Sequence, residues 1–348
     1  MEVHTGSRRL PPVVALAAVA AVVLTIGASP ALATTVVCGQ VITQDTHVSN
    51  DLLNCPADGL VIGAPNIKLD LGGHVIDGVH NAAAAGIANR LGFANVEITQ
   101  GTVQEFGFGV LLVGTTGNKV AHLTVAHNSA GHRGIVLQGS NGNKIEHNDV
   151  LDTFDGIHLS ASDGNRIRHN DVHNNLASAI VLIVGSENNR VDHNKTHDNP
   201  SWGITQDNAS NGNRYEHNKV FNNLIAGIEP FNSANLVIKK NKIYANRIGI
   251  ELFNTDTSTI TGNQIKGNTL DGIHSFTGSS GNLFAKNHSD RNGDDGIDIV
   301  DAGNTITKNH ANRNTDLGIF AAPGNVDGGG NKAKHNGNPA QCVGVSCN

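Results

Sequence analysis

Large side chains are scarce in this sequence. Only 4% of its 348 residues are aromatic, and it contains one Met and one Trp. A chain with so few bulky residues is not expected to fill one thick globular core. Disorder is excluded as well, because 38% of the residues are hydrophobic. Gly, with 41 copies, and Asn are abundant instead, which favours a thin core repeated along a rod.

An excess of positive charge is also missing. The sequence has 24 Lys and Arg residues against 30 Asp and Glu residues, for a formal net charge of −6. Because there is no basic block, the composition does not favour a nucleic-acid-binding protein. We expect a monomer without a nucleic-acid partner.

Long apolar runs are absent except near the N-terminus. There, Arg8 and Arg9 precede an apolar run over residues 13–26, and residues 31–33 have the small-x-small spacing of a cleavage site. We predict that residues 1–33 are a signal peptide and that the protein is secreted. No later stretch is apolar enough to span a membrane.

Cysteines are few and confined to the two ends of the chain. An exported chain favours disulfides, and the ends of a rod lie far apart. We therefore favour the pairs Cys38–Cys55 and Cys342–Cys347 over a metal site built from all four. Residues 34–59 are expected to form an N-terminal disulfide-bonded cap, and residues 337–348 a C-terminal cap with a short disulfide loop.

A repeat dominates the rest of the chain. A small residue followed by Ile or Val recurs eleven times at intervals of 22 to 25 residues, beginning at residues 86, 109, 134, 156, 179, 203, 227, 249, 272, 296 and 318. Within one unit, Ile157, Leu159, Ile167 and Val172 alternate with polar residues as short strands do. The pattern predicts an all-β fold over residues 60–336, a parallel β-helix of about twelve coils of about 23 residues each.

An Asn residue recurs at one place in the coils. We predict that it occupies a left-handed turn and passes amide hydrogen bonds from coil to coil. Its copies are Asn148, Asn170, Asn194, Asn218, Asn241, Asn263, Asn287 and Asn309.

The repeats, together with the opening "LDLGGHVIDG" at residues 69–78, resemble the right-handed parallel β-helix superfamily. That superfamily includes pectate lyases, polygalacturonases and mannuronan epimerases. The resemblance implies a right-handed solenoid. It also implies that the protein binds an extracellular polysaccharide and, if it is an enzyme, modifies it as a lyase, epimerase or hydrolase. Fold alone does not fix function. A non-catalytic surface, adhesion or structural rod, or a periplasmic-type accessory protein, remains the alternative.

Residues one coil apart stack, so a site would be a patch of neighbouring columns. The outward position after each Gly-Ile pair carries Glu229, Glu251, His274 and Asp298 in consecutive coils, which we predict to be catalytic. Aromatic and acidic neighbours are typical of sugar-binding clefts. The predicted substrate-binding residues are Trp202, Asp207, Phe231 and Phe253.

Two short motifs bear on this face. "GIEPF", around Glu229, resembles the Gly-x-Asp-Pro-His motif of mannuronan epimerases, but Phe231 replaces its His. "DGID", at residues 295–298, resembles part of the polygalacturonase signature, but no Gly-His-Gly follows. Stacked carboxylates need a cation or a proton between them, so we assign Asp271, Asp294 and Asp295 as metal ligands for Ca²⁺, a cofactor that many pectate lyases use.

A second column contains only histidines over five coils. Stacked imidazoles are candidate ligands for Zn²⁺ or Cu²⁺, but later coils carry Lys or Gly at the same position. We interpret this column as a surface ladder. Its members are His122, His147, His169, His193 and His217.

Overall fold

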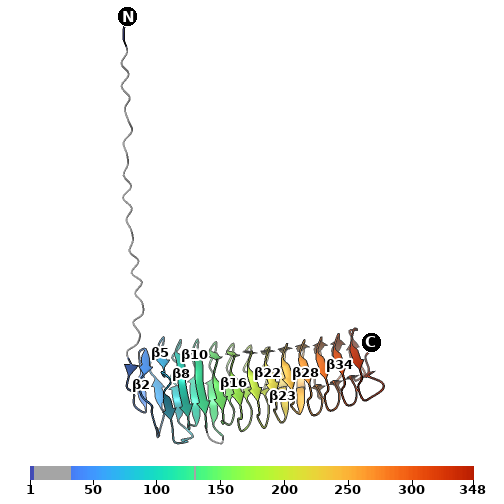
Figure 1. Cartoon of the computed structure of the whole chain (residues 1–348), viewed down its shortest axis with the longest axis horizontal. Helices are drawn as coiled ribbons and strands as arrows, with labels where there is room; N and C mark the ends of the chain where they lie inside the picture. Colours follow the sequence, from blue (N-terminus) through green and yellow to red (C-terminus); the bar gives the residue numbers. More distant parts are fainter. Residues whose placement is uncertain (4–32, 129–130) are drawn as a thin grey trace. The chain divides into compact units, whose positions relative to one another are not determined.

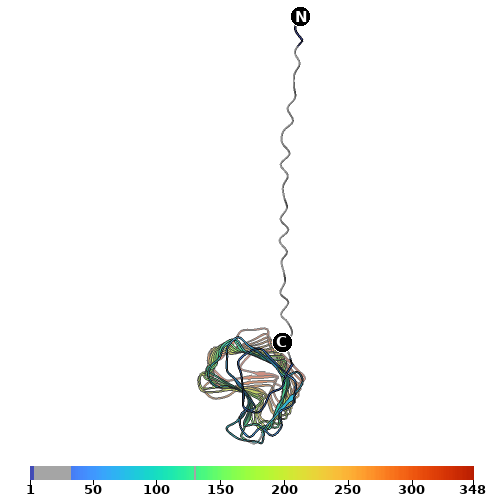
Figure 2. The same ribbon diagram turned by 90° about the vertical axis from the view of Figure 1, so that its left-hand side faces the viewer.

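The structure is a computed structural model that describes residues 1–3, 33–128 and 131–348. The predicted signal peptide therefore lies almost wholly outside the described residues. From residue 33 onward the chain forms short parallel strands joined by turns, with no helix among the described residues. The predicted all-β parallel solenoid is confirmed, with about 13 coils of about 23 residues. Figure 1 shows the coils side by side in chain order, and Figure 2 shows them superposed along the stack.

Each coil contributes one strand to a 14-stranded parallel sheet, called ladder I here. Its strands are β2 (Gln40–Ile42), β4 (Leu60–Ile62), β7 (Ala85–Asn89), β9 (Phe108–Val113), β11 (Arg133–Gln138), β14 (Ile157–Ser160), β17 (Ile180–Ile183), β20 (Ile204–Gln206), β23 (Ala226–Ala234), β26 (Ile248–Asp256), β29 (Ile273–Ser275), β32 (Ile297–Ile299), β35 (Ile319–Ala321) and β38 (Cys342–Val343). Ladder I thus pairs strands from both segments that were expected to be caps.

The remaining strands belong to a 24-stranded sheet with two ladders, joined where β8 and β10 run through both. Ladder II contains β1 (Ala33–Thr34), β3 (Thr46–Val48), β5 (Lys68–Asp70), β8 (Glu97–Gln104), β10 (Lys119–Ala126), β12 (Lys144–Glu146), β15 (Arg166–Arg168), β18 (Arg190–Asp192), β21 (Arg214–Glu216), β24 (Val237–Lys239), β27 (Thr259–Thr261), β30 (Leu283–Ala285), β33 (Thr305–Thr307) and β36 (Val326–Asp327). Ladder III adds β6 (Val75–Asp77), β13 (Asp149–Leu151), β16 (Asp171–His173), β19 (Lys195–His197), β22 (Lys219–Phe221), β25 (Lys242–Tyr244), β28 (Gln264–Lys266), β31 (His288–Asp290), β34 (His310–Asn312) and β37 (Lys332–Lys334).

The small residue of the repeat has a steric cause. A Cβ built on Gly156 would lie 2.3 Å from Val172 Cγ1 and 2.7 Å from the carbonyl oxygen of Ala179, one coil on. Only a residue with little or no side chain allows the chain to turn this close to the next coil. The following Ile points inward, and the inward residues of all three ladders form one continuous buried core.

The predicted Asn column is a buried hydrogen-bond ladder. Asn148 donates from its backbone N and its Nδ2 to Oδ1 of Asn170, both at 3.0 Å, and Asn170 repeats this with Asn194. The expected left-handed turn is displaced by one residue. It falls on the residue before each Asn, such as His147 at φ 58°. The Asn side chain is needed inside, where it satisfies backbone groups that would otherwise be buried without partners.

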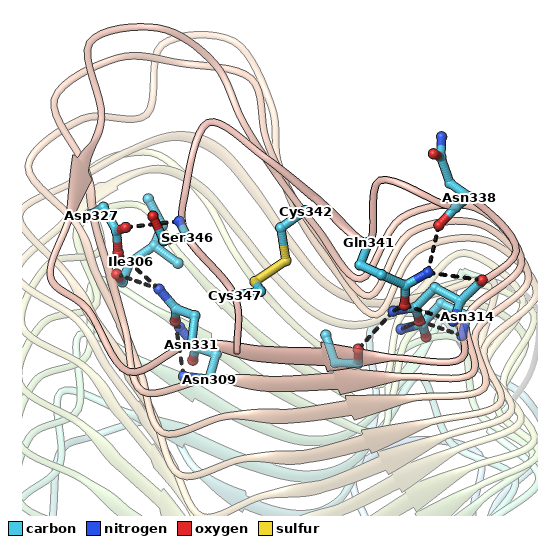
Figure 3. The surroundings of a disulfide bond; sticks show 12 residues. Ile306, Asn309, Asn314, Asp327, Asn331, Asn338, Gln341, Cys342, Ser346 and Cys347 are labelled. Carbon is cyan, nitrogen blue, oxygen red and sulfur yellow. Dashed lines mark hydrogen bonds between the residues drawn. A yellow bond between two sulfur atoms is a disulfide. The ribbon is translucent and has the colours of Figure 1, made fainter.

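Both predicted disulfides are present, Cys38–Cys55 and Cys342–Cys347. Figure 3 shows the second one at the end of the stack. Close to it, Gln341 accepts hydrogen bonds from the backbone N and the Nδ2 of Asn336, each at 3.0 Å. Gln341 thus takes the place of the next Asn in the amide ladder that runs through Asn314 and Asn336.

Candidate functional site

The four predicted catalytic residues lie in one row on the outer face of ladder I. Glu229 is on β23, Glu251 on β26, His274 on β29 and Asp298 on β32. Glu251 is in register with His274, and His274 with Asp298. Because hydrogen-bonded strands lie about 4.8 Å apart, the side chains of this row are immediate neighbours. We call these four residues the acidic row.

The acidic row contains three carboxyl groups and no Lys or Arg. Burial, with the charges of Glu251 and Asp207, raises the pKa of Glu229 to about 7. Burial also raises the pKa of Glu251, although His274 and Arg247 oppose the shift. At neutral pH, a substantial fraction of Glu229 therefore retains its proton.

His274 lies between two carboxyl groups. Its Nδ1 is 3.8 Å from Oδ2 of Asp271, and its Nε2 is 3.6 Å from Oδ2 of Asp298. Both separations exceed a hydrogen bond, so the imidazole attracts the two carboxylates without bonding to either. Burial raises the pKa of Asp271, and burial raises that of Asp298 to about 6.

A hollow of about 540 Å³ borders the first residue of the row. It brings together Glu229, Trp202, Asp207 and Phe231, three of which were predicted to bind substrate. Trp202 Nε1 is buried and has no hydrogen-bond partner among the described residues. Sequence analysis missed Phe154 and Thr205, which also line the hollow. Thr205 lies one coil before Glu229 in the same column, so the column alignment of the sequence could have placed it beside the site.

The phenylalanine column is a stack of rings. Ring centroids are 4.7 Å apart between Phe231 and Phe253, and 5.2 Å apart between Phe253 and Phe276. Both faces of Phe253 are therefore covered, and it offers a ligand only its edge. A sugar needs an open ring face for stacking. Phe231 has a ring partner on one side only among the described residues, and it lines the hollow.

The predicted metal ligands separate into two groups. Within the described part of the chain, two sets of three residues bring ligand atoms within 4.8 Å of one another. They are Asp271 with His274 and Asp298, and Asp294 with Asp295 and Asp316. The second set offers only carboxylate oxygens, which fits Ca²⁺. Asp316 was not among the predicted ligands, although it lies one coil after Asp294 at the same position, two residues before the Gly of the repeat.

The histidine column stacks as expected, with ring centroids 4.9 to 5.1 Å apart. Its members occupy the left-handed turn before the Asn ladder. None belongs to a group of three close ligand atoms in the described ranges. The geometry of the column is that of stacked imidazole rings at successive turns, as a surface ladder requires.

Fold and site define a parallel β-solenoid with an acidic and aromatic face. The model of the family "Right handed beta helix region" matches residues 69–220, 185–287 and 216–348. The chain belongs to this family of right-handed β-helix proteins. No curated protein matches its sequence.

Several solved structures share the fold at low identity. A mutant of the periplasmic alginate epimerase AlgG aligns with a TM-score of 0.58 at 14% identity, covering 88% of this chain and 78% of its own. The Dettilon tailspike protein gives 0.54 at 16% identity, covering 86% of this chain and 60% of its own. DFA-IIIase from Arthrobacter chlorophenolicus A6 gives 0.52 at 14% identity, covering 69% and 70%. At these identities the likeness establishes the fold alone.

Residues 1–3, 33–128 and 131–348 include no helix that could cross a bilayer.

Proposed function

We propose that this protein is a secreted glycoside hydrolase that binds a polysaccharide along ladder I. Glu229 is the general acid, and Glu251 is its carboxylate partner. The observation that carries the proposal is the raised pKa of Glu229, about 7, beside a hollow lined by Trp202 and Phe231. A general acid must hold a proton at working pH, and burial beside a second carboxyl is how such a pKa is reached.

The geometry favours a retaining mechanism. Glu229 and Glu251 project from adjacent strands, about 4.8 Å apart at the backbone, close to the about 5–5.5 Å between the carboxyls of retaining glycosidases. Glu229 donates its proton to the glycosidic oxygen as the bond from that oxygen to the anomeric carbon breaks, while Glu251 attacks the anomeric carbon and the leaving sugar departs. Water, deprotonated by Glu229, then displaces Glu251 and releases the second sugar. His274 and Arg247 favour the ionised form of Glu251, as a nucleophile requires.

The charge of the face favours a neutral glycan over a uronate. A lyase or epimerase acting on uronates would use His274 as its base, and it needs cations to neutralise the substrate carboxylate. The acidic row contains three carboxyls and no Lys or Arg. Ca²⁺ held by Asp294, Asp295 and Asp316 would supply positive charge at the far end of the row, where the oxygen-only donor set fits it.

The direct test is a screen of neutral and acidic polysaccharides, with reducing ends and unsaturated-uronate absorbance as separate readouts. Glu229→Gln and Glu251→Gln should each lower reducing-end release about 10²–10⁴-fold without lowering the melting temperature. Glu97→Gln, on ladder II, is the matched control. If both variants retain full binding and turnover, the row is scaffold and the non-catalytic rod is the better account.

A further inference from the structure

A second surface, on ladder III, combines lysines with stacked aromatic rings. Lys219 and Lys242 occupy one outward column, and Phe221, Tyr244 and Lys266 occupy the next. We call these five residues the lysine–aromatic stripe. It belongs to the other sheet and contains no residue of the acidic row.

The stack of rings in this stripe ends at Tyr244. Centroids are 4.7 Å apart between His197 and Phe221, and 4.9 Å apart between Phe221 and Tyr244, with nearly parallel planes. The next residue in the column is Lys266, whose Nζ lies 6.0 Å from the Tyr244 centroid. The outer face of Tyr244 therefore meets a cation and not another ring.

The positive charge of the stripe has no carboxylate partner. Lys195, one coil earlier, is neutralised by Asp171 at 3.0 Å. Lys219, Lys242 and Lys266 form no salt bridge with any described residue. Lys219 Nζ lies 4.9 Å from the Phe221 centroid, a contact that orients the ammonium but does not neutralise it. Like charges stacked in a sheet are destabilising, and violations of this kind concentrate at functional sites.

A shallow hollow of about 370 Å³ lies where the rings end. Lys242, Tyr244, Gln264 and Lys266 line it. Asp290 also lines the hollow and is in register with Lys266. Its carboxylate accepts hydrogen bonds from the backbone N and the Nδ2 of Asn312 and makes no ion pair with these lysines. Two lysine side chains and one aromatic ring thus line the same open hollow.

We propose that the lysine–aromatic stripe binds an acidic polysaccharide, separately from the groove on ladder I. A sugar ring lies along the exposed edge of Tyr244, and its carboxylate or sulfate lies between Lys242 and Lys266. Lysines repeat one per coil, about 4.8 Å apart, so successive acidic sugars of one chain meet successive ammonium groups. The rigid backbone of the ladder presents these groups in a line that matches a polymer better than an isolated anion.

The test measures binding of polygalacturonate to the full chain by calorimetry in EDTA, which removes Ca²⁺ bridges to the acidic row. The double variant Lys242→Gln/Lys266→Gln should weaken binding by about tenfold or more, and added salt should weaken binding of the wild type. The matched control is Lys332→Gln/Lys334→Gln, because these lysines occupy the same two columns on β37 and have no Phe or Tyr residue on the neighbouring strand. The control should bind like the wild type.

A second comparison separates this proposal from the first. Glu229→Gln should leave polygalacturonate binding unchanged, so loss of hydrolase activity and loss of stripe binding are independent results. Tyr244→Ala should weaken polygalacturonate binding, while binding through charge alone would not respond. Equal loss in the control variant, or equally tight binding of duplex DNA, would overturn the proposal, because either result means non-specific attraction to polyanions.

Discussion

The tetrapeptide Asp-Gly-Ile-His occurs twice in ladder I, at residues 155–158 and 271–274, and the two copies have opposite surroundings. In the first, Asp155 Oδ2 is 3.1 Å from His158 Nδ1 and 3.3 Å from Arg133 Nε. Arg133 lies one coil earlier in the column of Asp155. Val136 and Val181 stack on the two sides of His158. This copy is a closed and neutralised cluster.

In the second copy, the residues of the adjacent coils that lie beside the Asp and the His are different. Ile248 takes the place of Arg133, and Glu251 and Asp298 take the places of the two valines beside the imidazole. The His274–Asp271 separation widens to 3.8 Å, and the pKa of Asp271 rises. Identical local sequence thus gives a structural ion pair in one coil and an uncompensated acidic site in another. The coils before and after decide which.

The largest expected difference between the copies is in stability. His158→Ala should lower the free energy of unfolding by about 2–3 kcal/mol, because it opens a buried ion pair and leaves a cavity. His274→Ala should lower it by less than about 1 kcal/mol, because the imidazole bonds to neither carboxylate. Urea unfolding followed by circular dichroism measures both. Equal losses would mean that the two clusters do not differ energetically.

The acidic surroundings of the second copy also predict a pH dependence. The pKa of Glu229 is raised in the folded state, so its protonated form is favoured there. Its contribution to stability is complete below the unfolded pKa, about 4.3, and is lost as the pH rises to about 7.

Thermal melts in EDTA should therefore show a higher melting temperature at pH 5 than at pH 8, equivalent to about 1–2 kcal/mol after allowance for solvent screening. Glu229→Gln should reduce this difference but not abolish it, because burial also raises the pKa of Asp295 to about 7 and that of Asp298 to about 6. A wild-type melting temperature that stays constant across this range would contradict the inferred protonation of Glu229.

An arginine can be introduced beside the second copy at the position that Arg133 occupies beside the first. Ile248→Arg places a guanidinium where Arg133 lies relative to the first copy, and it should lower the pKa of Asp271 and stabilise the fold at neutral pH by about 1 kcal/mol. Ile248→Met controls for the lost packing without adding charge. The comparison fails if the Arg and Met variants melt at the same temperature at pH 8.

The smallest expected effect on the free energy of unfolding is that of Ca²⁺ bound near the second Asp-Gly-Ile-His copy. Ca²⁺ near its dissociation constant should stabilise the wild type by about 0.5 kcal/mol through Asp294, Asp295 and Asp316. Asp316→Asn should abolish the shift, and Asp163→Asn, remote from this group, should keep it. A Ca²⁺ shift that survives Asp316→Asn would place the ion elsewhere.

Much of the fold could be predicted because the repeat is local. A small residue before an inward Ile, followed by alternating apolar residues, specifies one strand and one tight turn, and near-constant spacing stacks the coils. Reading the columns then placed Glu229, Glu251 and His274 in one row. The Asn ladder was also found, but its turn was assigned to the wrong residue. From sequence alone, Asn and His are both acceptable in a left-handed conformation.

The sequence by itself determined the period of the repeat, the parallel stacking of the coils, the position of one disulfide at each end of the stack and the columns of outward side chains. Only the tertiary structure decided what those columns do. It stacked Phe253 between two rings and Phe231 against only one, and it joined Arg133 to Asp155 while placing no arginine beside Asp271. The physical reason is that protonation, ring exposure and ion pairing depend on atoms within a few ångströms. In a solenoid those atoms come from coils 22 to 25 residues away, through side-chain orientations that the repeat does not specify.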